Sequence, residues 1–258
     1  MLFLHGILGR GGNLRGVARK VLQARPRWGA VLVDLRLHGS SRAFPQPHTV
    51  AAAAADLLEL DAHLPGPVRG VLGHSFGGKV ALESLRLRGA SLAQVFTVDS
   101  SPSARPPDLS DSPTRDVIAL LEALPPTLPS RAALVERAVA AGLGRGLGDW
   151  LAMNLERRGD VWALALDLAG VRALLEDYLA LDQWPIVEAL PSGTRLHAII
   201  GERSRVYTDE DRARLAHLSA ASSGLTVHYL PTGHWVHVED PEGLVHAVVA
   251  GLEPDDAE

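Results

Sequence analysis

A glycine-flanked serine is the residue whose setting best suits it for chemistry. Ser75 lies in Gly73-His74-Ser75-Phe76-Gly77, a G-x-S-x-G pattern between a predicted strand and a predicted helix. A sharp strand-to-helix turn exposes the serine hydroxyl, and glycines permit the close backbone approach that such a turn needs. The first amides of the following helix direct partial positive charge at the same point. A glycine-rich turn that only packs a helix on a sheet is the alternative, but Gly78 and the flanking elements favour a nucleophile.

A serine hydroxyl is a poor nucleophile without a base. Of the 11 histidines, His234 is the best candidate because it follows the last predicted strand, in Pro231–Trp235, and comes after Ser75 in the chain. His237 forms H-x-x-H with His234. No acidic third ligand accompanies that pair, so we expect a packing role for His237 and no metal site.

A loop that follows the first predicted strand is suited to stabilising a negatively charged oxygen. It reads His5-Gly6-Ile7-Leu8-Gly9. In acyl transfer by a serine, backbone N–H groups from such a loop and from the residue after the nucleophile bind the oxyanion. We therefore expect the amides of Ile7 and Phe76 to be the donors, the alternative being a plain strand-ending turn.

These residues are positioned by short apolar segments that alternate with longer amphipathic ones, a pattern typical of a parallel α/β sheet. Strands are predicted at Leu2–Leu4, Ala30–Val33, Arg69–Gly73, Gln94–Val98, Arg195–Ile200 and Leu225–Tyr229. Helices between them are predicted at Val17–Gln23, Thr49–His63, Lys79–Leu87, Asp209–Ala220 and Pro241–Leu252. The carboxyl ends of parallel strands meet at one edge, so the candidate residues are expected to lie together there.

The alternation stops between Pro102 and Leu190, where the chain is proline-punctuated and largely helical. An extended piece is predicted at Asp160–Leu166, and helices are predicted at Thr114–Leu124, Arg131–Ala141, Leu147–Arg157 and Ala169–Leu181. The predicted organisation is an α/β core in two parts, residues 1–101 and 191–258, with a helical cap over residues 102–190. We expect the cap to cover the carboxyl ends of the strands, where open α/β sheets bind ligands.

Composition excludes several classes of protein. The 258 residues are 47% hydrophobic and 21% charged, which suits a folded core. A net charge of −5 without a basic block argues against a nucleic-acid or anionic-membrane surface. The absence of cysteine excludes disulfides and thiol nucleophiles and fits a cytoplasmic location. No targeting signal is evident, and no apolar run approaches the ~18 residues of a membrane helix.

Four segments together resemble the α/β-hydrolase superfamily. They are His5-Gly6, Asp34–Ser41 (D-x-R-x-H-G-x-S), Gly73–Lys79 (G-H-S-x-G-G-K) and Gly233–His237. Over nearly its whole length the chain is similar to small bacterial carboxylesterases and thioesterases related to mitochondrial abhydrolase-domain proteins. The resemblance implies an α/β-hydrolase fold and hydrolysis of carboxylic esters or thioesters by a Ser–His–acid triad, without a cofactor.

The acid is where the chain departs from many members of that superfamily. Many carry it in a G-x-x-D turn after the strand assigned here to Arg195–Ile200, where this chain has Gly201-Glu202-Arg203-Ser204. The resembled branch takes its acid from the end of an earlier strand, which is Asp99 here, and has a serine in the later turn. A carboxylate must orient the imidazole, so we expect Asp99 to do so. The alternatives are Asp209 and Glu202.

Another carboxylate, Asp34, also ends a predicted strand. Because it precedes Ser75 in the chain, we expect it to be structural, with Arg36 or His38 as its partner.

The chain opens directly on the strand that leads into His5-Gly6, whereas the superfamily usually has two edge strands before it. The sequence thus predicts that these strands are missing. A changed sheet edge could favour a homodimer, and a wrongly placed start codon is the alternative.

The residues favour a serine hydrolase whose small-molecule substrate is an acyl ester or thioester. Ser75 would attack the acyl carbonyl, His234 would transfer the proton, and water would resolve the acyl-enzyme. The same fold and triad could serve C–C bond hydrolysis or cofactor-free oxidative chemistry. A non-catalytic ligand-binding receptor is a third hypothesis.

The cap is expected to determine which substrates the site accepts. Its leucines and its tryptophans Trp150, Trp162 and Trp184 could line an apolar pocket for short-to-medium acyl chains, although each could equally be cap core. The cap shows no evident arginine cluster for a carboxylate. Its individual candidates are Arg131, Arg145, Arg157 and Arg158.

Overall fold

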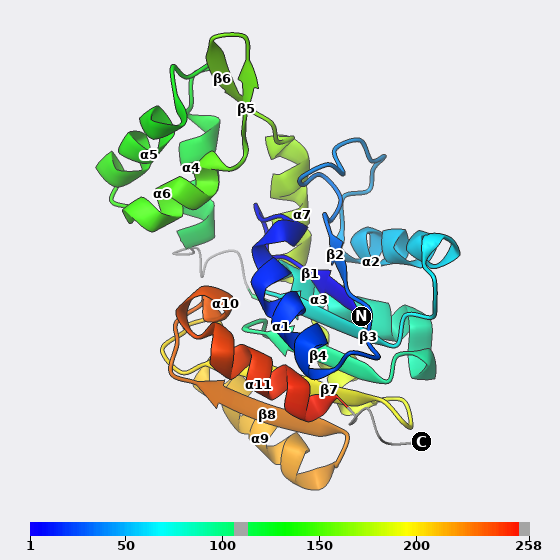
Figure 1. Ribbon diagram of the computed structural model, residues 1–258. Helices are drawn as coiled ribbons and strands as arrows, with labels where there is room; N and C mark the ends of the chain where they lie inside the picture. The colour runs from blue at the N-terminus through cyan, green and yellow to red at the C-terminus, as the bar shows by residue number, and fades with distance from the viewer. Residues whose placement is uncertain (106–112, 253–258) are drawn as a thin grey trace.

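A computed structural model describes residues 1–105 and 113–252 (Figure 1). Its centre is a six-stranded sheet with the order β2-β1-β3-β4-β7-β8, and each neighbouring pair is parallel. The strands are β1 (Leu2–Leu4), β2 (Val31–Val33), β3 (Gly70–His74), β4 (Gln94–Val98), β7 (Arg195–Gly201) and β8 (Leu225–Leu230). The predicted parallel α/β sheet is therefore confirmed.

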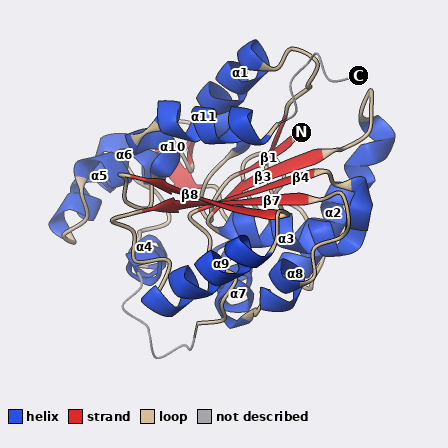
Figure 2. Ribbon diagram, turned by 90° about the horizontal axis from the view of Figure 1, so that it is seen from below, coloured by secondary structure: helices blue, strands red, loops and turns tan. Residues whose placement is uncertain are grey.

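Helices cover both faces of this sheet (Figure 2). One face carries α1 (Arg15–Ala24), the short α10 (Val236–Glu239) and α11 (Pro241–Gly251). The other carries α2 (Val50–Glu59), α3 (Phe76–Arg88), α8 (Trp184–Glu188) and α9 (Asp209–Ala221). The 3-10 turns are η1 (Gly11–Leu14), η2 (Leu60–His63) and η3 (Gly89–Ser91).

Side chains of each strand alternate between two hydrophobic cores. Leu2 and Leu4 pack on the α2–α3 side, whereas Phe3 packs on the α1–α11 side. All three are fully buried. Burial on both faces explains why the strands are almost continuously apolar and not alternately polar.

The chain leaves the sheet after β4 and returns at β7. Before α8, the inserted segment contains α4 (Pro113–Glu122), α5 (Arg131–Ala140), α6 (Arg145–Ala152), β5 (Leu155–Arg158), β6 (Val161–Leu164) and α7 (Leu168–Ala180). In Figure 1, α5, α6 and the β5–β6 hairpin form a lobe to one side of the sheet, and α7 runs between that lobe and the core. The division of the chain at residues 101 and 190 stays a prediction.

The helix predicted at Leu147–Arg157 is wrong in its second half. Helix α6 ends at Ala152, and Leu155–Arg158 pairs antiparallel with Val161–Leu164. Gly159, with φ of 61°, turns the hairpin. The Gly159-Asp160 dipeptide was a usable turn signal, but cross-strand pairing outweighs local helical periodicity here.

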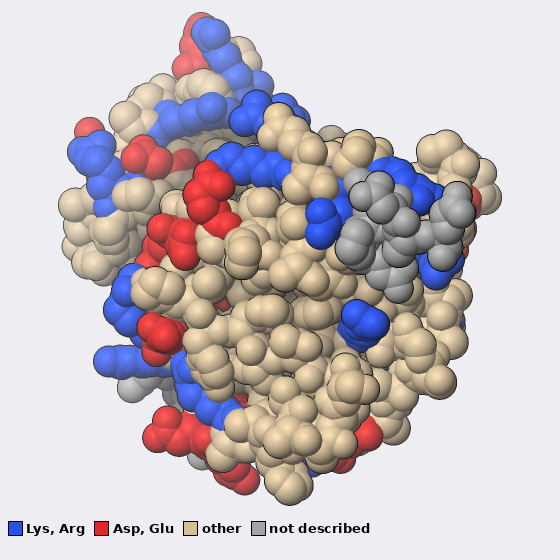
Figure 3. Space-filling model, turned by 60° about the horizontal axis from the view of Figure 1, so that its bottom comes forward, with Lys and Arg blue, Asp and Glu red and all other residues tan. Residues whose placement is uncertain are grey.

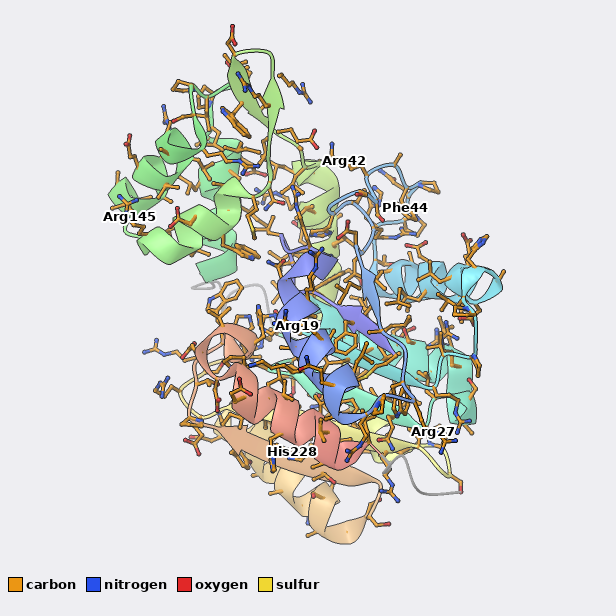
Figure 4. All side chains as sticks on the ribbon, viewed as in Figure 1. Arg19, Arg27, Arg42, Phe44, Arg145 and His228 are labelled. Carbon is orange, nitrogen blue, oxygen red and sulfur yellow. The ribbon has the colours of Figure 1, made fainter. Side chains whose placement is uncertain are left out.

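Asp34 does not pair with either predicted partner. Its two carboxylate oxygens accept hydrogen bonds from the amides of Gly11 and Ser40, each at 2.9 Å. Arg36 instead forms a bidentate pair with Asp56, at 2.7 and 2.8 Å. The buried guanidinium also lies 5.2 Å from the ring centre of Phe44, which Figure 4 labels.

We expect Asp56→Ala to lower the free energy of unfolding by about 3 kcal/mol, because it leaves a buried guanidinium without its counter-charge. The Arg36 side chain is only 5% exposed. Urea titration followed by circular dichroism measures the loss. Glu122→Ala is the control, since it breaks the exposed pair with Arg172 and should cost less than about 1 kcal/mol. Equal losses in the two variants would contradict the burial argument.

No helix within residues 1–105 and 113–252 is both long and apolar enough to span a bilayer. On the face shown in Figure 3, basic and acidic side chains alternate along the margins of a broad uncharged area. Charges of one sign do not dominate that face.

Candidate active site

Ser75 lies at a tight turn between β3 and α3, at the carboxyl edge of the sheet. Its φ of 52° and ψ of −118° place a non-glycine residue in a strained region of backbone space. The turn leaves no room for side chains at its glycines. A Cβ on Gly73 would lie 1.9 Å from the Gly77 carbonyl oxygen, and one on Gly77 would lie 2.5 Å from the carbonyl oxygen of Leu4. Glycine at both positions is therefore what lets the helix start directly after the serine.

His234 and Asp99 meet at the same edge. The Nδ1–H of His234 donates to Oδ2 of Asp99 at 2.7 Å. Asp99 is fully buried at the end of β4. Its carboxylate also accepts from the Ser204 hydroxyl at 2.5 Å and the Gly201 amide at 3.2 Å. A proton held at Nδ1 leaves Nε2 as the basic nitrogen of a neutral imidazole.

The two alternative acids lie apart from this contact. Glu202 and Asp209 are both exposed, and among the hydrogen bonds and ion pairs of the described residues the His234 partner is Asp99. Ser204, at the position where many family members have the acid, supplies a hydroxyl to Asp99 instead. The structure thus brings Asp99 and His234 together and leaves the alternatives outside.

Two buried histidines hold the loop that contains Ile7. The Leu8 amide donates to Nε2 of His38 at 2.9 Å, and the Leu35 amide donates to Nε2 of His5 at 3.0 Å. Each Nε2 accepts a hydrogen bond, so both rings must be neutral with their protons on Nδ1. The Leu8 backbone, with φ of 64°, is fixed in this way, and Ile7 and Phe76 line the same cavity as Ser75. Sequence inspection missed these contacts because they join residues 30 positions apart.

Burial keeps both rings neutral. Burial, with a smaller contribution from the nearby His38, lowers the pKa of His5 from 6.5 to about 3. Burial also lowers the pKa of His38 to about 4. Neither ring is expected to be protonated in the folded protein above about pH 5.

These pKa values predict a loss of stability in acid. Below about pH 6.5 the unfolded chain binds protons that the folded chain excludes, so the free energy of unfolding falls by about 1.4 kcal/mol per pH unit for each such histidine. Urea titrations at pH 7.5, 6.0 and 5.0 measure the slope. We expect His38→Gln to reduce the dependence of the free energy of unfolding on pH by the contribution of one histidine, about 1.4 kcal/mol per pH unit. His63→Gln, at an exposed position, should leave this dependence unchanged. An unchanged slope in His38→Gln would contradict the argument.

His74 supports the backbone of His234. Its Nε2–H donates to the His234 carbonyl at 2.8 Å, and burial holds the pKa of His74 well below its usual value. The ring centre of His237 lies 4.6 Å from that of His74, which agrees with a packing position for His237. Within the described residues, no group of three or more histidine, aspartate or glutamate side chains is arranged to hold a metal ion.

A cavity of about 500 Å³ opens beside Ser75 and His234. The inserted segment contributes one apolar side of its wall, with Val117, Leu147, Trp150, Leu175 and Leu179, and the core contributes further apolar side chains.

Of the three tryptophans considered from the sequence, Trp150 lines this cavity. Trp162 instead lies 4.5 Å from the guanidinium carbon of Arg131. Trp184 is buried and donates its Nε1–H to the Ser103 hydroxyl at 2.7 Å. Two of the three are therefore packing residues.

Tyr178 is a lining residue that sequence inspection missed. Its ring centre lies 6.1 Å from that of Phe76, the residue after the serine, and burial raises the pKa of its hydroxyl. A tyrosine in an amphipathic helix gives no sequence signal that separates this position from ordinary core.

Lys79, which directly follows the Gly77-Gly78 pair of the serine motif, joins the sheet layer to the inserted segment. Its Nζ donates to the carbonyls of Ser103, Tyr178 and Leu181, at 2.9, 2.8 and 2.6 Å. Asn154 adds a second contact, because its Nδ2 donates to the Leu8 carbonyl at 2.9 Å. The inserted segment is therefore tied both to α3 and to the loop beside Ile7.

Comparison of the sequence with protein families gives one broad match. The sequence model of the alpha/beta hydrolase family matches residues 1–247. The sn-1-specific diacylglycerol lipase ABHD11 of Danio rerio is 25% identical over 271 residues, which cover 98% of this chain and 78% of the relative. The Mus musculus protein of the same name is 27% identical over 258 residues, covering 98% of this chain and 80% of the relative.

Comparison with solved structures finds the same architecture. The structure of an esterase from a marine microorganism superposes with a TM-score of 0.81 at 20% sequence identity. The superposition covers 97% of this chain and 94% of that esterase. At this level of identity the likeness shows a shared fold.

Proposed function

The chain belongs to the alpha/beta hydrolase family, and we propose that it is a serine hydrolase of carboxylic esters in which Ser75 is the nucleophile, His234 the base and Asp99 the acid. The observation that carries this proposal is the 2.7 Å contact from Nδ1 of His234 to the buried Asp99, at the sheet edge where Ser75 occupies its strained turn. A base oriented by a third group is the signature of an activated serine.

The reaction proceeds in two halves. The Ser75 oxygen bonds to the acyl carbon while Nε2 of His234 takes the hydroxyl proton, and the amides of Ile7 and Phe76 stabilise the resulting oxyanion. The carbon–oxygen bond to the alcohol then breaks, and His234 returns the proton to the leaving oxygen. Water, activated by the same histidine, attacks the acyl-enzyme and releases the carboxylic acid.

The substrate is proposed to be an ester with a short-to-medium acyl chain. Support comes from the apolar wall that the inserted segment contributes to the cavity and from relatives whose names describe a lipase that acts on diacylglycerol. A thioester would follow the same steps, with a thiol as leaving group. On this proposal the inserted segment is the cap of the site.

The test is a pre-steady-state assay combined with covalent labelling. The wild-type protein should hydrolyse p-nitrophenyl esters, from acetate to dodecanoate, with a burst of about one p-nitrophenol per active site. A fluorophosphonate should add once, on the peptide that contains Ser75. Labelling without turnover of any ester would favour the receptor or another reaction of the triad, and a failure of both would exclude Ser75 as an active nucleophile.

Two expectations stay predictions, namely the homodimer and the cytoplasmic location. Light scattering tests the homodimer, and fractionation of cells tests the cytoplasmic location.

A further inference from the structure

Arg105 brings an unmatched cation to the cavity that contains Ser75. It lines that cavity, and its backbone amide donates to the Leu179 carbonyl at 2.6 Å, which fixes it against the end of α7. Its Nη2 is buried and has no hydrogen-bond partner among the described residues. A buried N–H group without an acceptor is costly, so the protein does not satisfy this guanidinium fully, and the rest of the side chain lines the cavity.

The rest of the lining leaves this charge unbalanced. Among the described residues that line the cavity, arginines occur at three positions and none is acidic; they are Arg105, Arg203 and Arg205. Arg203 is already paired, because its guanidinium contacts Glu239 at 2.9 Å and donates to the Pro231 carbonyl. Arg205 is exposed. Arg105 is therefore the partly buried cation of this lining that has no carboxylate partner among the described residues.

Arg105 and Ser75 line the same cavity of about 500 Å³. Tyr178 lines it too, and the carbonyl of the next residue, Leu179, accepts the hydrogen bond from the Arg105 amide. A substrate bound at Ser75 therefore shares one cavity with Arg105.

The four cap arginines considered from the sequence lie elsewhere. Arg145 is exposed at the outer edge of the lobe (Figure 4). Arg131 stacks on Trp162, and Arg157 and Arg158 are exposed on the β5–β6 hairpin. None of the four lines the cavity of the described structure.

We propose that Arg105 is a specificity-determining residue that binds a negatively charged oxygen group of the substrate, a carboxylate or a phosphate. The inference rests on the proposed function and narrows its substrate to esters that carry an acidic group. Guanidinium suits such a group because it presents parallel N–H donors. The neutral part of the same molecule packs on the wall formed by Leu147, Trp150 and Leu175.

The test compares matched esters that differ in charge. The acidic ester is mono-p-nitrophenyl adipate, its neutral match is p-nitrophenyl methyl adipate, and a p-nitrophenyl ester ending in a phosphonate represents the phosphate alternative. We expect the wild type to favour an acidic ester by about 10- to 100-fold in kcat/KM, mainly through a lower KM. Whichever acid is preferred identifies the group.

Variants at Arg105 provide the second arm. Arg105→Gln should bring the ratio of acidic to neutral kcat/KM close to one, and Arg105→Lys should keep part of it. Arg172→Gln, at an exposed position paired with Glu122, should leave the ratio as in the wild type. A wild-type ratio near one, or a ratio that survives Arg105→Gln, would overturn the proposal.

Calorimetry separates this proposal from the proposed function. Binding of the adipate monoester to Ser75→Ala needs no turnover, and it should weaken about 10-fold or more when Arg105→Gln is added. If that weakening occurs but the wild type hydrolyses no ester, the anion subsite stands and the proposed function fails. If acidic and neutral esters are hydrolysed at equal rates and bound with equal affinity, the proposed function stands and the anion subsite fails.

Discussion

Replacing Ser75 with alanine is expected to reduce ester turnover by about 10⁴-fold or more, because it removes the hydroxyl that forms the acyl-enzyme. The burst of p-nitrophenol and the fluorophosphonate adduct should both vanish. The fold should survive, since alanine is smaller than serine and the turn geometry is set by the flanking glycines. Stopped-flow kinetics, intact-protein mass spectrometry and circular dichroism of the same preparation measure the three effects.

Ser40→Ala is the matched control, because Ser40 is exposed and its backbone amide makes the contact to Asp34. It should retain wild-type turnover and labelling. If Ser75→Ala hydrolyses esters at the wild-type rate, the proposed mechanism is wrong.

Asp99→Asn is expected to reduce turnover by about 10⁴-fold while leaving the fold intact. The carboxylate accepts hydrogen bonds from His234, Ser204 and Gly201. An asparagine has one oxygen and one NH₂ group, so it cannot accept all three. An NH₂ group facing Nδ1 would hold the imidazole in the tautomer whose Nε2 carries a proton, and that nitrogen is then no base.

The most informative comparison measures kcat for variants of the two alternative acids, which are exposed to solvent. Asp209→Asn and Glu202→Gln are isosteric changes at exposed positions and should leave kcat close to the wild-type value. A large loss in either variant, with Asp99→Asn active, would move the acid to that residue.

The α/β-hydrolase fold predicted from the sequence is confirmed, and its central features come from local patterns. Buried strands such as Gln94–Val98 are short, largely apolar segments. The turn at Ser75 is marked by glycines at positions where a Cβ would clash with the backbone. His234 and Asp99 were found by their places at strand ends, and the structure brings them within 2.7 Å. Their catalytic roles stay a proposal.

The remaining features depend on contacts between distant residues. No spacing rule pairs Arg36 with Asp56 and not with Asp34, because the contact forms only when α2 packs on the sheet. The hydrogen bond from Leu8 to His38 has the same origin, whereas the hairpin after α6 is a local contact that the Gly159-Asp160 turn marks in the sequence. Arg105 carries no motif, and its proposed role depends on its place in the lining of the folded cavity.

The inserted segment enters and leaves the sheet layer at adjacent points. The Gln183 amide donates to the Pro102 carbonyl at 2.8 Å, and Lys79 contacts carbonyls on both sides of that junction, at Ser103 and Leu181. A replacement segment would have to match these ends and also restore the contacts that Lys79 makes with Tyr178 and that Asn154 makes with Leu8. We therefore expect exchange of this segment between family members to change the pocket, and to preserve the stability of the sheet layer only where those contacts are kept.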